Sequence, residues 1–164
     1  MPATRQHPNR SEGRKFRQRG QTLVEFALVS LLFFVVLIGL IEFARALWTW
    51  NTIVQATRAG ARFAVVETPA ASDTTVKNYV VYLNAAGTGS AVLPGLTTSN
   101  VQVSYFKHAN PPVAATTVSE KYNADIVQIS ITGYSFNFVV PFFGSGITLP
   151  PFMTTLPLEG LGAI

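Results

Sequence analysis

The most prominent pattern in the chain is an apolar run from Leu23 to Ile41 that follows a polar N-terminal segment. Only Glu25 is charged within the run, and Ser30 and Gly39 interrupt it mildly. A helix of this length spans roughly 28 Å, which is close to the hydrocarbon thickness of a bilayer. A buried helix of a soluble protein is rarely apolar on every face for so long. The pattern therefore predicts one membrane-spanning helix.

The pattern becomes two-faced after the apolar run, and no proline occurs between Glu42 and Val65. We therefore expect the helix to continue beyond the membrane. Trp48 and Trp50 follow the run closely, at the level where aromatic residues anchor helices among the headgroups. Small residues recur every four positions in this part of the chain, at Ala56, Gly60 and Ala64. This packing strip permits close approach of another element, either the chain's own sheet or a neighbouring subunit.

The rest of the chain has the pattern of a small mixed domain. Residues 66–75 resemble a linker, residues 76–85 follow helical spacing, and residues 101–105 alternate as a half-buried strand does. The best strand pattern covers Ile126–Phe138, where a change of phase at Gly133 predicts a β-bulge.

We predict an α+β fold, in which the outer half of the long N-terminal transmembrane helix packs on a small, mostly antiparallel β-sheet with one short helix. The predicted parts are a basic cytoplasmic leader at 1–20, the transmembrane helix with its amphipathic extension at 21–65, and an exported domain at 66–164. Pro150-Pro151 interrupts the alternation expected of a last strand and leaves its register open.

Charge is concentrated at the N-terminus, where six of the 12 basic residues lie at or before Arg19 and Glu12 is the only acidic one. We expect this head to be disordered and to remain on the cytoplasmic side, with the C-terminal domain outside. The sequence pI of about 9.7 does not indicate nucleic-acid binding, because the basic excess lies in this short head. The chain has no cysteine, which excludes disulfides.

Candidate catalytic groups are few. His7 and His108 do not form a pair at metal-ligand spacing, and neither a phosphate-binding glycine loop nor a G-x-S-x-G elbow occurs. Four acidic residues of the C-terminal part are scattered and have no neighbour that suggests an acid–base pair: Asp73, Glu120, Asp125 and Glu159. We therefore expect a non-enzymatic protein without a cofactor, metal site or small-molecule substrate.

The informative cluster lies where the chain enters the apolar run, in the segment Arg19-Gly20-Gln21-Thr22-Leu23-Val24-Glu25-Phe26. An ionised carboxylate inside an apolar helix costs a few kcal/mol unless it is paired or near the interface. Thr22 and Glu25 fit a capping box, which would explain the glutamate without a partner. That explanation does not account for the basic residues that end at Gly20.

Gly20 followed by Glu25 resembles the prepilin cleavage signature, in which prepilin peptidase cuts after the glycine. The segments from Gly20 to Leu28 and from Gly39 to Arg45 resemble TadE-like proteins of the tight adherence (Tad/Flp) type IV pilus systems, and the resemblance is specific over residues 19–64. It implies a minor pilin or pseudopilin that is anchored by a single span in the cytoplasmic membrane and assists pilus assembly after leader cleavage. The implied partners are prepilin peptidase, other pilins and the pilus assembly platform.

The same resemblance implies roles for particular residues. Processing would involve Gly20, Gln21, Glu25 and Phe26, and assembly would involve Glu25, Glu42 and Arg45. After cleavage the new amine of Gln21 would be a cation in apolar surroundings, and Glu25 of an adjacent subunit would pair with it.

Two other interpretations remain open from the sequence. Ala44-Arg45-Ala46 fits a signal-peptide cleavage site, although the apolar run is longer than usual and the helical pattern continues through this site. An unprocessed single-span anchor with an outer binding domain explains everything except the pairing of Gly20 with Glu25.

Overall fold

The computed structural model describes residues 12–67, 73–109, 111–140, 144 and 146–158, with side chains from residue 20 onward. The chain divides into two compact units, Met1–Phe43 and Ala44–Ile164. The predicted fold class is confirmed: a long apolar N-terminal helix is followed by a four-stranded antiparallel sheet and short helices.

The N-terminal helix α1 covers Glu12–Val66 and contains the one membrane-span candidate found among the described residues. None of the most apolar window of α1 is buried, so its side chains face the surroundings on every side. The expectation of disorder in the head is wrong for Glu12–Gly20, which is helical; residues 1–11, which include His7, lie outside the described residues. No proline follows Pro8 until Pro69, and Arg, Lys, Gln and Glu are good helix formers, so nothing in this segment stops the helix.

The main sheet of the second unit has the strand order β2-β1-β3-β6, and all of its pairs are antiparallel. Its strands are β1 (Val101–Lys107), β2 (Val113–Ala115), β3 (Ile126–Ile131) and β6 (Phe152–Pro157). The alternation predicted for β3 is confirmed, because Val127, Ile129 and Ile131 are buried while the residues between them are partly exposed. These three side chains belong to the hydrophobic core.

The change of phase at Gly133 has a different cause from the predicted bulge. β3 ends at Ile131, Gly133 adopts a left-handed φ of +67°, and the chain then enters β4 (Ser135–Phe136). β4 pairs with β5 (Ile147–Thr148) in a separate two-stranded sheet. The predicted bulge in one continuous strand is therefore wrong, because the chain leaves the main sheet at this glycine. Pro150-Pro151 lies where the chain returns from the two-stranded sheet to the main sheet, between β5 and β6.

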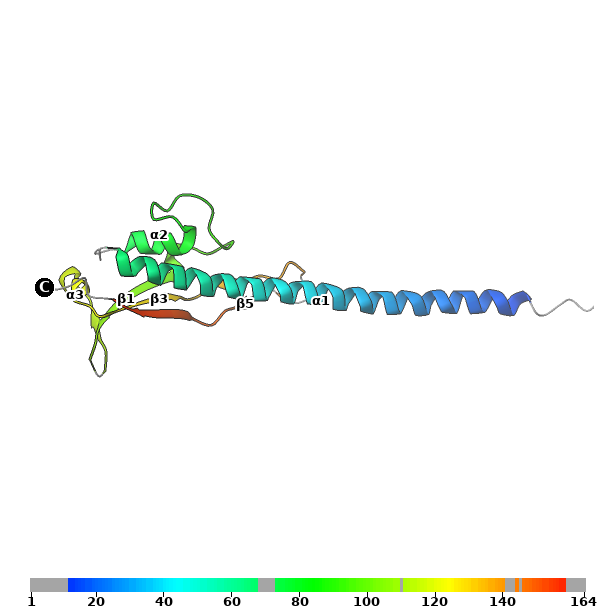
Figure 1. The fold of residues 1–164 in the computed structure, drawn as a ribbon. Helices are drawn as coiled ribbons and strands as arrows, with labels where there is room; N and C mark the ends of the chain where they lie inside the picture. Colours follow the sequence, from blue (N-terminus) through cyan, green and yellow to red (C-terminus); the bar gives the residue numbers. More distant parts are fainter. Residues whose placement is uncertain (1–11, 68–72, 110, 141–143, 145, 159–164) are drawn as a thin grey trace, which may run out of the picture. The chain divides into compact units, whose positions relative to one another are not determined.

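The core of the second unit forms where the outer part of α1 meets helix α2 (Thr74–Tyr82) and the main sheet (Figure 1). The Phe63 ring of α1 stacks on the Tyr79 ring of α2, with centroids 4.2 Å apart. The Thr154 hydroxyl on β6 donates to the Thr57 hydroxyl on α1 at 3.1 Å. α1 therefore packs against both α2 and the sheet, as the amphipathic pattern predicted. Residues 68–72 of the predicted linker lie outside the described residues.

Two short helical elements complete the second unit: the 3-10 turn η1 (Thr98–Asn100) and helix α3 (Val118–Tyr122). Glu120 caps α3, since its carboxylate accepts hydrogen bonds from the backbone N–H groups of Thr117 and Thr116. These backbone hydrogen bonds, together with one from the Thr116 hydroxyl, lower the pKa of Glu120 to about 2. The Thr117-x-x-Glu120 spacing is that of a capping box, which predicts a helix that starts at this point.

Candidate functional site

Gly20 and Glu25 lie in the first unit, on the exposed surface of α1. A Cβ atom added to Gly20 would meet no atom within 4 Å apart from its chain neighbours and the backbone of its own helix. The bond between Gly20 and Gln21 lies inside the helix, and the helix continues on both sides of it. Phe26, the other predicted processing residue, is 70% exposed.

Glu25 accepts a hydrogen bond from the side-chain amide of Gln21, with Nε2 3.2 Å from Oε1. The two residues are four positions apart, so both side chains lie on the same face of α1. The capping box proposed for Thr22 and Glu25 requires a helix that begins at Thr22, whereas α1 begins at Glu12. In the intact chain Glu25 is therefore an interior residue of the helix, and the capping explanation applies only to a chain cut after Gly20.

The two other predicted assembly residues, Glu42 and Arg45, lie farther along α1. Glu42 is about 25 Å from Glu25 along the helix, so the structure does not bring the two carboxylates together. Glu42 is only 4% exposed, in contrast to Glu25. The Arg45 guanidinium carbon lies 5.2 Å from the centre of the Phe136 ring, which is cation–π distance. The Arg45 charge also opposes the burial that raises the pKa of Tyr134.

The packing strip of Ala56, Gly60 and Ala64 lies on the buried face of α1. A Cβ atom added to Gly60 would collide with the Val80 side chain of α2 and lie 3.8 Å from the Ile129 Cγ2 atom of β3. Gly60 therefore lies at a close contact of α1 with α2 and near β3. The neighbours of this glycine are the chain's own α2 and sheet.

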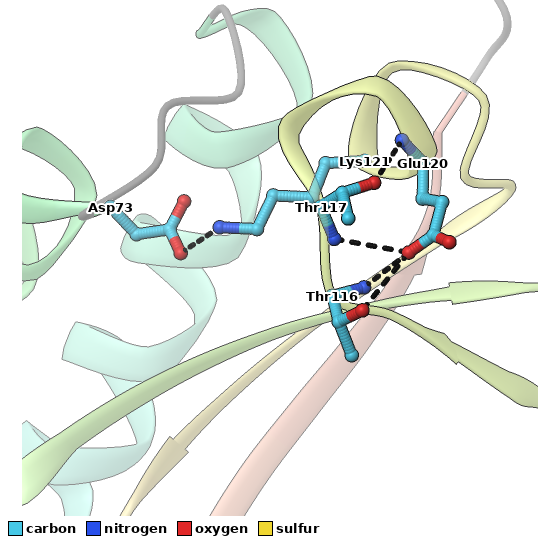
Figure 2. A network of polar contacts seen from close by, with 5 residues as sticks. All are labelled: Asp73, Thr116, Thr117, Glu120 and Lys121. Atoms are coloured by element: carbon cyan, nitrogen blue, oxygen red, sulfur yellow. Dashed lines mark hydrogen bonds and ion pairs between the residues drawn. The ribbon is translucent and has the colours of Figure 1, made fainter.

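A buried ion pair joins α3 to the start of α2 and was missed from the sequence (Figure 2). Lys121 Nζ lies 2.5 Å from Asp73 Oδ2, and the two side chains are 9% and 10% exposed. Lys121 also lies 5.3 Å from the centre of the Tyr105 ring. Burial, and then the negative charges of Asp73 and Glu67, raise the pKa of Tyr105 to about 12. Asp73 and Lys121 are 48 positions apart, so no local pattern indicated the pair.

The described residues contain no group of histidine, aspartate and glutamate side chains that could hold a metal ion. His108 is exposed after the end of β1, where its backbone N–H donates to Asp125 Oδ2 at 2.6 Å. Glu159, the last of the scattered acids, lies outside the described residues. The described polar contacts of the second unit include the cap of α3 and the Asp73–Lys121 ion pair.

Comparison with known proteins gives one match, to the family model described as TadE-like protein, over residues 20–62. The matched segment lies entirely within α1 and includes the residues from Gly20 to Arg45 that were singled out above. The resemblance drawn from the sequence is therefore confirmed for this part of the chain. No curated protein and no solved structure gives a significant match.

Proposed function

We propose that this chain, whose residues 20–62 match TadE-like proteins, is a pilin-like membrane protein that assists assembly of a Tad/Flp type IV pilus after leader cleavage at Gly20. The observation that carries the proposal is the position of the match. It begins at Gly20, includes Glu25 and follows a helix in whose most apolar window no residue is buried. A helix of this kind needs a bilayer or neighbouring helices around it.

Cleavage after Gly20 would require a local opening of α1. A peptidase that binds an extended chain cannot act on a bond held inside a helix, so this turn must first unwind. Glycine is about 0.8–1.0 kcal/mol less favourable in a helix than alanine, which makes unwinding easier at this position. Gly20 also presents no side chain that could block the cleft of a prepilin peptidase.

Glu25 would act after cleavage. The new N-terminal amine of Gln21 would be a cation at the end of an apolar helix, where it needs a carboxylate partner. In the intact chain Glu25 already accepts a hydrogen bond from the Gln21 side chain, so its carboxylate lies on the same helix face. Glu25 of one subunit would pair with the Gln21 amine of the next and set the axial register of packed helices.

The charge distribution supports an orientation with residues 1–20 in the cytoplasm and the second unit outside, because the basic residues concentrate before the span. Protease added to intact spheroplasts should digest the C-terminal part and spare an epitope placed before Gly20. Protection of the C-terminal part together with loss of the epitope would overturn the orientation.

Replacement of Glu25 by glutamine separates the assembly role from a capping role. If Glu25 only caps its own helix after cleavage, Glu25→Gln should cost about 0.3–1 kcal/mol, because glutamine also completes a capping box. If Glu25 pairs with a neighbouring amine, the change leaves a cation without its partner. The association of the subunits should then be weakened by about 3–5 kcal/mol. We expect Glu25→Gln to be cleaved and inserted, yet to lose co-purification with other pilins and to abolish piliation.

The readouts are pull-down of other pilins and the yield of surface pili, with Ser30→Ala in the same span as the control. Ser30→Ala should behave as the wild type in both assays. Normal piliation with Glu25→Gln would remove the pairing mechanism and leave the capping role standing.

An unprocessed single-span anchor is the second candidate. The continuity of α1 from Glu12 to Val66 is compatible with it, because an anchor of this kind keeps its helix uncut. This candidate predicts that the mature chain retains its leader and that Glu25→Gln has no effect on pilus yield.

A further inference from the structure

Contacts within the second unit fix the direction in which its strands follow α1. Arg45 lies against Phe136 of β4, the Trp50 ring is 4.5 Å from the Phe152 ring of β6, and Thr57 bonds Thr154. The β4–β5 pair therefore lies at the lower-numbered end of the helix in this unit. Arg45 follows the last apolar residue of the run, Ile41, by about 6 Å of helix. The β4–β5 pair thus contacts the part of the second unit that follows the apolar run most closely in the sequence.

Large apolar side chains are exposed at this same end of the second unit. Four of them are between 48% and 70% exposed: Leu47, Trp48, Val139 and Ile147. Two belong to α1, and the other two belong to β5 and to the segment after β4, so the exposed apolar surface is not confined to the helix. A face in contact with water does not normally expose so many large apolar side chains.

Charged residues, in contrast to apolar ones, are rare at the β4–β5 end of the second unit. No charged residue occurs between Ile126 and Leu158, and Arg45 is the only charged side chain of α1 from Ala44 to Gln55. The acidic residues described in the second unit lie elsewhere: Glu67, Asp73, Glu120 and Asp125. Asp125 accepts a hydrogen bond from the backbone N–H of His108, which follows the end of β1. Figure 1 shows α3, which carries Glu120, away from the β4–β5 end of this unit.

We propose that the β4–β5 end of the second unit rests on the outer surface of the membrane, with Trp48, Val139 and Ile147 inserted among the lipid headgroups. The inference rests on the proposed function, because it requires α1 to span the bilayer. The acidic residue next to this end, Glu42, is only 4% exposed. An aromatic residue, aliphatic residues and one arginine, without an exposed carboxylate, form the combination that a lipid surface accepts. The contact would hold the small domain against the bilayer until the subunit is extracted.

The test uses single-cysteine labelling, which the absence of native cysteine makes direct. The full chain carrying Ile147→Cys is labelled with the fluorophore NBD and reconstituted in excess phosphatidylethanolamine–phosphatidylglycerol vesicles. Val113→Cys, an exposed valine of β2 at the far end of the sheet, is the matched control within the same unit. Leu32→Cys, in the middle of the apolar run, is the control for insertion of the span.

Doxyl-labelled lipid should quench the label at Ile147 several-fold more strongly than the label at Val113, and aqueous iodide should give the reverse order. Val139→Cys should behave like Ile147→Cys. Equal quenching at Ile147 and Val113, with Leu32 quenched by lipid, would overturn this inference and leave the proposed function intact. A blue-shifted label at Ile147 that lipid does not quench would also overturn it, because a second protein copy would then cover the face. Absence of lipid quenching at Leu32 would remove the proposed function as well.

Discussion

At the scale of single residues, the Asp73–Lys121 ion pair is a buried charged contact that ties α3 to the start of α2. Asp73 adopts a left-handed φ of 50°, and its second carboxylate oxygen, Oδ1, has no hydrogen-bond partner among the described residues. A buried carboxylate that is only partly satisfied depends strongly on its one cationic neighbour. Lys121 is therefore the residue on which the position of Asp73 depends.

Removal of the lysine charge should destabilise the domain substantially. We expect Lys121→Met to lower the free energy of unfolding by about 3–5 kcal/mol, because it leaves the Asp73 carboxylate buried without a counter-ion. Urea unfolding of the full chain in detergent micelles measures this change. The Asp73→Asn/Lys121→Met double variant should recover part of the loss, since asparagine tolerates the left-handed conformation and carries no charge. A loss below about 1 kcal/mol in Lys121→Met would show that the pair contributes no more than a surface salt bridge.

At the scale of elements, α1 packs tightly against α2 and lies near β3 at Gly60. Gly60 has no side chain there, and a Cβ atom would collide with Val80, which is fully buried. Glycine is ordinarily unfavourable in a helix interior by about 1 kcal/mol relative to alanine. The gain in helix propensity and the steric collision therefore act in opposite directions in Gly60→Ala.

We expect the collision to prevail, so that Gly60→Ala lowers the free energy of unfolding by about 1–3 kcal/mol, as overpacking does. Val80→Ala removes the colliding methyl group, Cγ2, and the methyl group added by Gly60→Ala then fills part of the space. The double variant should accordingly be more stable than the sum of the two single changes predicts. Urea unfolding of all four chains gives this coupling energy. Additive effects would show that Gly60 and Val80 do not constrain each other.

At the scale of the whole molecule, the sequence indicates the elements better than their arrangement. The apolar run, the extension of α1 and the alternation in β3 each depend on local periodicity, which a single sequence displays. The change of phase at Gly133 was also visible, but its meaning was not, because a bulge and a change of sheet give the same alternation. The partner of Gly60 and the Asp73–Lys121 pair arise from contacts between distant segments.

For the candidate site, too, the sequence shows the local pattern but not its structural surroundings. Gly20 and Glu25 were predicted from a short motif, and their neighbourhood depends only on one helix. What the motif does not indicate is that α1 begins at Glu12, so that the bond after Gly20 lies inside a helix. The good helix formers before Gly20 carry this information, although their charge and the nearby prolines favoured disorder.

The N-terminal residue of the mature chain decides whether the helix is cut where the proposal requires. In cells with an active prepilin peptidase, mass spectrometry of the purified protein should show a chain that begins at Gln21. Gly20→Leu should remain uncut while still inserting in the membrane, and Val24→Leu, which enlarges an exposed residue of the same helix, should be cut normally. A wild-type chain that begins at Met1 or Pro2 would contradict processing and favour the plain anchor, and one that begins at Leu47 would establish a signal peptide.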